Sequence, residues 1–377
     1  MLTRLQILLF SSLLIVATTS YGAIPKPPKL AAKAYILQDF HSGKVIASKN
    51  ADQRIEPASL TKMMTAYVVE NELKYGNIKL TDQVKISSKA RFMKGSRMFV
   101  EENSLVSVEK LLKGIIIQSG NDATVAMAEH VAGTEKAFVS LMNAYAEEMG
   151  MKNTHFVNST GMPHRNHYTT ANDMILLSKA LIGEFPEHYS LYAEKEYQYN
   201  GIKQKNRNRL LWEAEFVDGI KTGHTESAGF CLAASGKKGD MRLISIVVGT
   251  RSDRARATES LKLLTYGFKY YETHRLYAAN EALTKARVWK GTVEEMPLGI
   301  ENDLYVTIPR GTFEKLKAKM KLDSQILAPT TEGDVYGRVK IDLGKNEVIE
   351  RDLVALRGVG KGGFFQSMMD EVILVFE

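Results

Sequence analysis

Cysteine and proline are scarce in this chain, and glycine is not enriched. The 377 residues include one cysteine, nine prolines and 28 glycines. A single cysteine cannot form an internal disulfide, which excludes a disulfide-stabilised miniprotein, and we expect Cys231 to be a small buried apolar residue. The low proline and glycine content excludes a collagenous or low-complexity chain. With 44% hydrophobic residues, the composition also excludes a disordered chain and a polytopic membrane protein.

The chain also lacks the usual features of nucleic-acid-binding proteins and of zinc sites. Its net charge is only +7, it has no block of five or more like charges, and its basic residues are not interleaved with aromatic ones. The small positive excess suits an anionic partner or surface, but we expect no nucleic-acid partner. No Cys/His cluster has zinc spacing, so no metal site is expected.

Residues 1–23 have the pattern of a secretory signal peptide. Arg4 precedes an apolar run from Leu5 to Ala17, and small residues follow as far as Ala23. The run is short for a permanent helix across about 30 Å of hydrocarbon, although an N-terminal membrane anchor is the alternative. We therefore expect an exported protein whose mature chain starts near residue 24.

Residues 362–377 form a short segment with helical periodicity. Its apolar residues are spaced alternately by one and by three, at Phe364, Phe365, Met368, Met369, Val372, Ile373 and Phe376. The predicted helix is about 21 Å long, which is too short to cross a bilayer. An amphipathic helix fits either a membrane surface or a docking position on its own protein. Asp370, Glu371 and Glu377 would be repelled by anionic lipid, which weakens the anchor interpretation.

Residues 24–280 alternate strand-like and helical patterns. We expect strands at Ala34–Asp39, Lys44–Ala47, Gly219–Thr222, Gly229–Ser235 and Met241–Gly249. We expect helices starting near Ser59 and over Val108–Ile117, Ala123–Ala132, Ala137–Met149 and Arg256–Glu272. Strands, then many helices, then more strands and a closing helix predict an α+β fold in which helices cover an antiparallel sheet.

Residues 281–361 have a different character and predict a small all-β domain. Short alternating runs bounded by turn residues are found at Ala286–Trp289, Leu304–Ile308 and Gly337–Ile341. The exception is Thr312–Lys321, where we expect a helix. The chain is therefore expected to contain two domains followed by the short C-terminal segment.

Ser59-Leu60-Thr61-Lys62 places a nucleophile and a base one helical turn apart. Residues three apart on a helix have Cβ atoms about 5–6 Å from each other. A serine hydroxyl is a weak nucleophile until a base takes its proton, and a lysine is able to act as that base where burial lowers its pKa. The spacing alone is weak evidence, because Ser107–Lys110 and Ser235–Lys238 share it.

Two further motifs follow in order along the chain. Ser119-Gly120-Asn121 lies in a turn between predicted helices, and Lys221-Thr222-Gly223 lies on a predicted strand. On a strand the lysine and the threonine project to opposite faces, and the glycine lets a ligand backbone approach. The set S-x-x-K, S-x-N and K-T-G in this order is typical of penicillin-binding proteins and class A β-lactamases.

At these motifs the chain resembles the low-molecular-mass penicillin-binding proteins of the D-alanyl-D-alanine carboxypeptidase type, the penicillin-binding protein 5-like family. The matching stretches are residues 57–64, 118–123, 152–156 and 218–225, and more loosely 303–310 and 362–365. The resemblance implies a penicillin-binding-protein/β-lactamase-like transpeptidase domain at 24–280. It implies that the β domain at 281–361 is a stalk and that 362–377 is a membrane-surface anchor.

The activity that the resemblance implies is that of a serine-type hydrolase. It would remove the terminal D-alanine from peptidoglycan stem pentapeptides through an acyl-enzyme on Ser59, and it would bind β-lactams covalently without a cofactor. The implied location is the periplasm, with peripheral contact to the outer face of the cytoplasmic membrane. The terminal segment is more acidic than the family's usual anchor, which argues against stable attachment.

The resemblance also assigns expected roles to individual residues. Ser59 would be the acylated nucleophile and Lys62 its general base, while Ser119 and Asn121 would relay a proton and hold the substrate amide. The backbone N–H groups of Ser59 and of the strand near His224 would form the oxyanion hole.

The expected carboxylate-binding group lies on and around the third motif. Lys221 would supply positive potential and Thr222 a hydroxyl contact, with Gly223 allowing close approach. His224 is expected either to shape the cleft or to take part directly. Arg207 and Arg256 match arginines near this end of the site, with a plain ion-pair role as the alternative for each.

Two other functions stay open from the sequence alone. A β-lactamase needs an efficient water-activating base, which class A enzymes supply as a glutamate between the second and third motifs. Residues 149–183 contain no glutamate, and Asp173 is their only carboxylate. A non-catalytic wall-binding scaffold is the other alternative, and the intact motif set argues against it.

Overall fold

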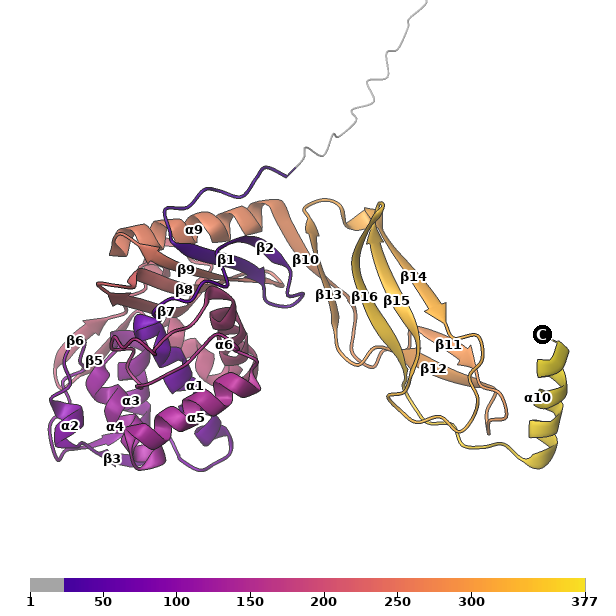
Figure 1. Ribbon diagram of the computed structural model, residues 1–377, viewed down its shortest axis with the longest axis horizontal. Helices are drawn as coiled ribbons and strands as arrows, with labels where there is room; N and C mark the ends of the chain where they lie inside the picture. The colour runs from indigo at the N-terminus through magenta and orange to yellow at the C-terminus, as the bar shows by residue number, and fades with distance from the viewer. Residues whose placement is uncertain (1–23, 377) are drawn as a thin grey trace, which may run out of the picture.

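The computed structural model describes residues 24–376, which form two bodies and a terminal helix (Figure 1). The larger body contains a five-stranded sheet and most of the helices, and the smaller one is built from strands. The signal peptide expected at residues 1–23 lies outside the described residues.

An antiparallel sheet forms the centre of the larger body. Its strands are β1 (Ala34–Asp39), β2 (Val45–Lys49), β7 (Val217–Thr225), β8 (Gly229–Lys238) and β9 (Met241–Thr250). They lie in the order β2-β1-β9-β8-β7, and every neighbouring pair is antiparallel. The predicted antiparallel sheet is confirmed, and β7, which carries the third motif, is an edge strand.

Helices cover both faces of this sheet (Figure 1). Apolar side chains along β9 point alternately to the two faces of the sheet, so both faces need a cover. Ile244 and Ile246 pack into the core beneath the main helical layer, whereas Leu243 and Val247 pack into the core beneath α9. The α-helices are α1 (Thr61–Lys74), α2 (Ser88–Arg91), α3 (Val108–Lys113), α4 (Asn121–Ala132), α5 (Glu135–Glu148), α6 (Ala171–Glu184), α7 (Pro186–Tyr189), α8 (Leu210–Glu213) and α9 (Asp253–Tyr270).

Short elements complete the helical layer. They are the 3-10 turns η1 (Ala58–Leu60) and η3 (Ser190–Ala193), the π-helix η2 (Gly114–Gln118), and the strand pairs β3 (Gln83–Lys85) with β4 (Leu105–Ser107) and β5 (Glu196–Tyr199) with β6 (Ile202–Lys205). Cys231 on β8 is fully buried and forms no disulfide, which confirms the expectation for it.

The smaller body is a β structure that starts directly after α9. A two-stranded sheet pairs β10 (Tyr271–Tyr277) with β13 (Leu304–Pro309). The five-stranded sheet has the order β11 (Thr284–Arg287), β12 (Glu295–Gly299), β16 (Asn346–Ala355), β15 (Val335–Leu343), β14 (Leu316–Leu322). Because β10 pairs with β13, this body includes a strand that precedes the boundary expected at residue 281.

The helix expected over Thr312–Lys321 is wrong. Only the 3-10 turn η4 (Phe313–Lys315) forms there, and the chain then continues as β14, which pairs with β15. The sequence Leu-Lys-Ala-Lys-Met-Lys-Leu alternates apolar and charged residues with period two, and pairing with a neighbouring strand favours that period over the helical one.

Polar side chains at the junction connect the two bodies. The Thr273 hydroxyl donates to the buried carboxylate of Asp39 at 2.7 Å, and the Ser42 and Thr307 hydroxyls are 2.6 Å apart. Asp39 is the last residue of β1 and Ser42 lies in the turn between β1 and β2, whereas Thr273 and Thr307 lie on β10 and β13. These contacts attach the β body to the end of β1 and to the turn that follows it.

The terminal helix α10 (Phe364–Phe376) contacts the β body through its acidic face. The backbone N–H of Lys290 donates to Asp370 at 2.6 Å, and the Lys290 ammonium lies 3.1 Å from Glu371. Phe364 and Phe365 are about four-fifths exposed. Within residues 24–376, no helix has the length and apolar character to cross a membrane.

Candidate active site

Ser59 lies where the chain turns into α1, directly against the edge strand β7. Ala58 has the left-handed φ of +48°, and Ser59 follows it in η1 with its side chain partly exposed. Gly223 on β7 allows the approach: a Cβ there would lie 3.1 Å from the Pro57 carbonyl oxygen and 3.3 Å from the Leu60 nitrogen. The serine therefore faces the strand that carries the K-T-G motif.

Lys62 occupies the next turn and points at the nucleophile. Its Nζ lies 3.2 Å from Ser59 Oγ, donates to Asn121 Oδ1 at 2.7 Å and donates to the Thr160 carbonyl at 2.6 Å. The side chain is only 1% exposed. The first two motifs are therefore brought together as the sequence analysis expected, and a carbonyl from a third segment joins them.

Burial prepares this amine for proton transfer. Removal from water, with a smaller contribution from the charge of Arg207, lowers the pKa of Lys62 to about 7, although Asp122 opposes the shift. A lysine with that pKa is substantially neutral at physiological pH and has a lone pair available for the Ser59 proton.

The loop that supplies the Thr160 carbonyl is folded around Asn158. Its Oδ1 accepts the N–H groups of Thr160, Gly161 and Met162 at 3.2, 2.7 and 3.1 Å. Gly161 has a φ of +86°, and a Cβ on it would lie 1.8 Å from the Ala58 carbonyl oxygen. A glycine is required here because the loop packs directly on the turn that bears the nucleophile.

His167 connects the same loop to the start of α1 through hydrogen bonds. The Val157 N–H donates to its Nδ1 at 3.0 Å, so Nε2 carries the proton and donates to Thr61 Oγ1 at 2.8 Å. Thr61 in turn donates to the Ala58 carbonyl at 2.8 Å. Burial lowers the pKa of His167 to about 4, so the ring is neutral near pH 7.

The S-x-N turn is held by a buried carboxylate. Asp122 accepts the N–H groups of Met98, Phe99 and Val100 at 2.9, 2.8 and 3.3 Å. Ser119 has a φ of +63°, and its hydroxyl is buried without a hydrogen-bond partner within the described residues. A buried hydroxyl with an unused donor and acceptor is suited to pass a proton to a bound molecule.

Asn121 is locked in place from its other end, because its Nδ2 donates to the Lys94 carbonyl at 2.6 Å. This bond fixes the orientation of the amide, so that its oxygen accepts from Lys62.

Lys221 and Thr222 are both almost fully buried on β7. Burial lowers the pKa of Lys221 well below its usual range, and the charges of Lys62, Arg207 and Arg256 lower it further. An anion that entered beside Lys221 would relieve this concentration of positive charge. The K-T-G strand is therefore electrostatically prepared for a carboxylate.

The three flanking residues occupy different positions. His224 is exposed and stacks on Phe230, with the ring centroids 3.9 Å apart, so it lines the strand end. Arg207 is exposed and donates to the Gln118 carbonyl at 3.2 Å, next to the S-x-N turn. Arg256 is buried on α9, donates to the Gly223 carbonyl at 3.0 Å and pairs with Asp253. It supports β7 from the side of α9.

Sequence reasoning assigned no role to Thr160, Gly161, His167 or Asp122. Asp122 belongs to a stretch that matched the family, but its three backbone donors come from residues more than twenty positions away. The 158–167 loop carries no recognisable motif, and its only signal is the matching stretch at 152–156 just before it.

Comparison with known proteins identifies both bodies. The D-alanyl-D-alanine carboxypeptidase family profile matches residues 22–252, and the profile of the penicillin-binding protein 5 C-terminal domain matches residues 271–361. The chain is 45% identical over 361 residues to D-alanyl-D-alanine carboxypeptidase DacA of Escherichia coli strain K12, covering 94% of this chain and 90% of that one.

Solved structures agree with these matches. Penicillin-binding protein 5 from Haemophilus influenzae superimposes with a TM-score of 0.87 at 42% identity, over 89% of this chain and 100% of that one. Ampicillin-bound penicillin-binding protein D2 from Listeria monocytogenes superimposes with a TM-score of 0.60 at 27% identity, over 65% of this chain and 100% of that one.

Proposed function

The chain belongs to the family of D-alanyl-D-alanine carboxypeptidases, and from that premise we propose how its residues carry out the reaction. The enzyme is a serine-type hydrolase of peptidoglycan stem peptides and a penicillin-binding protein. The observation that carries the proposal is the position of the buried Lys62 amine, 3.2 Å from Ser59 Oγ, together with a pKa lowered to about 7.

Acylation begins when the neutral Lys62 amine takes the proton of Ser59. Oγ attacks the carbonyl carbon of the penultimate D-alanine, and the backbone N–H groups of Ser59 and His224 stabilise the negative oxygen. The C–N bond then breaks, Lys62 returns the proton through Ser119 to the terminal D-alanine nitrogen, and free D-alanine leaves. The peptide remains as an ester on Ser59.

Recognition of the terminal carboxylate falls to the third motif. Lys221 supplies the positive potential and Thr222 the hydroxyl contact, while Arg207 adds charge from the S-x-N side. Arg256 acts through Gly223, whose carbonyl it holds at 3.0 Å. A substrate without a free C-terminal carboxylate would leave this cluster of positive charge uncompensated.

Deacylation requires water, and the Lys62 amine is the base placed to activate it. The β-lactamase alternative would require a further carboxylate near the ester. Asp173 is the only carboxylate between residues 149 and 183, and it is engaged elsewhere: it accepts the Asn153 N–H at 2.9 Å and the Thr154 hydroxyl at 2.7 Å. Slow release of a bound β-lactam fits this arrangement.

The test is release of D-alanine from a pentapeptide ending in D-Ala-D-Ala. The wild-type protein should release D-alanine, and Lys62→Ala should lose it by a factor of about 10³ or more, because the attacking hydroxyl is no longer activated. Lys110→Ala is a matched control: Lys110 has the same spacing from Ser107 but is exposed. Equal activity of Lys62→Ala and wild type would refute the proposed base.

We also propose that the protein is exported to the periplasm and that α10 contacts the outer face of the cytoplasmic membrane. The signal-like pattern of residues 1–23 supports export. The contact of Asp370 and Glu371 with Lys290 supports the membrane orientation, since it turns the acidic face toward the protein and leaves Phe364 and Phe365 exposed.

Flotation of the mature chain with phospholipid vesicles tests this orientation. Phe365→Glu should reduce the vesicle-bound fraction, whereas Leu327→Glu, at an exposed apolar position on the β body, should not. If both variants float as the wild type does, α10 is not the contact.

A further inference from the structure

A depression of about 600 Å³ lies next to the catalytic site, at the end of β7. Its walls include residues 53–56, which lead to the nucleophile, residues 164–168 of the loop that holds Lys62, and residues 227–228 in the turn after β7. None of the residues assigned to proton transfer or to binding of the terminal carboxylate lines it. The depression is therefore a separate compartment that adjoins the site.

The direction of the substrate on β7 leads toward this depression. In the proposed reaction the terminal carboxylate lies at Lys221 and Thr222, and the scissile carbonyl lies at the His224 N–H. Residues before the scissile bond must then continue past His224 toward the turn. Each extended residue spans about 3.3 Å, so the stem residues two and three positions before the terminal D-alanine lie alongside residues 225–228.

The lining of the depression carries positive charge that no carboxylate neutralises. Lys33, Arg54 and Arg165 each contribute a cation, and none of them forms an ion pair with any described residue. Glu56 is the one carboxylate among the described residues of the lining, and the Ser227 hydroxyl donates to it. Three cations against one carboxylate leave an excess of two positive charges.

The surroundings of the depression leave this excess in place. Four charged residues flank the depression without lining it, two of each sign: Asp52, Glu226, Lys49 and Arg251. The unbalanced charge therefore belongs to the lining itself.

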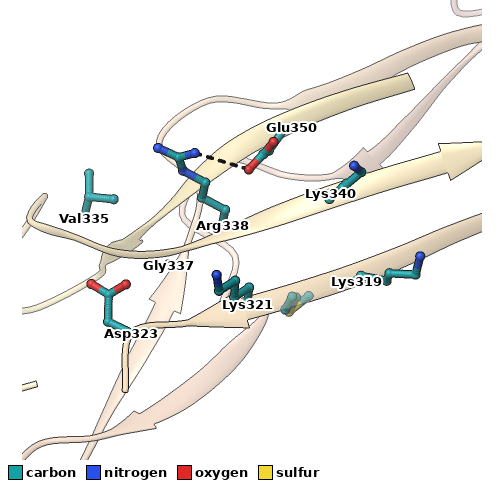
Figure 2. A pocket seen from close by; sticks show the side chains of 9 residues that line it. Lys319, Lys321, Asp323, Val335, Gly337, Arg338, Lys340 and Glu350 are labelled. Carbon is teal, nitrogen blue, oxygen red and sulfur yellow. Dashed lines mark ion pairs between the residues drawn. The ribbon is translucent and has the colours of Figure 1, made fainter. Parts of the chain in front are cut away.

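Figure 2 shows a contrasting depression, on the outer face of β14 and β15. There Arg338 pairs with Glu350 at 3.5 Å, as the dashed line marks, and Lys319 pairs with Asp342 at 2.9 Å. An incoming anion would have to compete with these carboxylates of the protein. No such competitor faces the cations at the end of β7 within the described part of the chain.

Arg54 is held in place by groups that leave its charge intact. Its guanidinium lies over the Tyr168 ring, 4.4 Å from the centroid, and its Nε and Nη2 donate to the Asn153 amide oxygen at 3.4 and 3.2 Å. Nη1 forms no hydrogen bond to any described residue. An aromatic face and a neutral acceptor orient the guanidinium without neutralising it, which suits a carboxylate that arrives with the substrate.

We propose that this depression binds a free carboxylate of the stem peptide upstream of the scissile bond, with Arg54 and Arg165 as specificity-determining residues. The second residue of a peptidoglycan stem is a glutamate linked through its γ-carboxyl group, so its α-carboxylate is free to bind. The inference rests on the proposed function, because it uses the direction of the substrate on β7. It adds a second carboxylate site to the one at Lys221.

A matched pair of pentapeptides tests the proposal. Both end in D-Ala-D-Ala, and they differ only in the α-carboxylate of the second residue, which is free in one and amidated in the other. The wild type should release D-alanine from the free acid with a kcat/KM about three- to tenfold higher, the effect of two partly exposed charge contacts. Added salt should reduce this preference. Arg54→Gln/Arg165→Gln should lose the preference and keep the wild-type rate on the amidated peptide.

Two controls accompany this variant. Arg254→Gln/Arg357→Gln removes two exposed cations that do not line the depression, and it should keep the preference for the free acid. Penicillin carries no upstream stem carboxylate, so its acylation of Ser59 should proceed at the wild-type rate in both double variants, which excludes misfolding as the cause.

The contradicting outcomes separate this inference from the proposed function. Equal kcat/KM of the wild type on the two peptides would overturn the carboxylate site. An equal loss on both peptides in Arg54→Gln/Arg165→Gln would overturn it as well. Release of D-alanine from neither peptide by the wild type would instead overturn the proposed function, on which the inference rests.

Discussion

Gly161 lies so close to Ala58 that a Cβ on it would be 1.8 Å from the Ala58 carbonyl oxygen. This contact joins the loop that holds Lys62 to the turn that presents Ser59. Gly161→Ala should therefore destabilise the protein by about 3 kcal/mol or more, from the left-handed backbone and the forced displacement together. It should also slow penicillin acylation, because the Thr160 carbonyl moves away from Lys62.

Gly150→Ala is the control for this change. Gly150 has a similar φ of +73°, but nothing lies within 4 Å of its Cβ position. It should lose only about 1 kcal/mol of stability and keep wild-type acylation. Urea unfolding and stopped-flow acylation measure both quantities, and equal behaviour of the two variants would show that the contact with Ala58 is unimportant.

Asp122→Asn should loosen the S-x-N turn. The carboxylate accepts three backbone N–H groups from residues 98–100, and a neutral amide replaces one acceptor oxygen by a donor. We expect a loss of about 2 kcal/mol in unfolding free energy and slower acylation. Asp82→Asn, which affects one exposed bond to the Lys79 N–H, should change neither by much. An Asp122→Asn protein as stable as the wild type would contradict this account.

Because His167 is buried with a lowered pKa, we expect the free energy of unfolding to decrease in mild acid. Its pKa in the folded protein is lowered to about 4 from an ordinary 6.5, so between these pH values the unfolded chain binds a proton that the folded one does not. The contribution of His167 to the free energy of unfolding is therefore fully present above about pH 6.5. It decreases as the pH drops toward 4, by at most about 3 kcal/mol.

Urea unfolding between pH 7.5 and pH 4.5 measures this effect. The wild type should lose more stability over that range than His167→Asn, which cannot titrate. The same pH dependence in both proteins would mean that His167 is not the group responsible.

Arg256→Lys should reduce activity although the charge is kept. A lysine cannot both reach the Gly223 carbonyl and pair with Asp253 as the guanidinium does. The β7 strand should then be less well positioned, and kcat/KM for the pentapeptide should fall about tenfold. Arg254→Lys, at an exposed neighbouring position on α9, serves as the control and should be unaffected.

Local patterns in the sequence predicted much of the fold. The antiparallel sheet, the helix that starts at the nucleophile and the buried Cys231 follow from alternation, helical spacing and composition, all of which depend on nearby residues. The helix expected over residues 312–321 failed because the β14 segment is fixed by pairing with β15, a contact between residues about twenty positions apart.

The sequence could predict only those parts of the site whose residues lie close together along the chain. Ser59 and Lys62 are three residues apart, so the helix itself brings them together. Thr160 reaches Lys62 across nearly a hundred positions, and Asp122 reaches residues 98–100 across more than twenty. Such contacts depend on how the elements pack in the fold, and no fixed spacing in the sequence predicts them.

The pH dependence of penicillin acylation at Ser59 tests the central claim most directly. Because Lys62 must be neutral to accept the proton and its pKa is about 7, the acylation rate should rise with pH, reach half its maximum near pH 7 and level off above about pH 8. Lys62→Arg, which stays charged, should be acylated at least about a hundredfold more slowly. A rate that is flat from pH 5.5 to 9.5, or a half-maximum near the ordinary lysine pKa, would contradict the account.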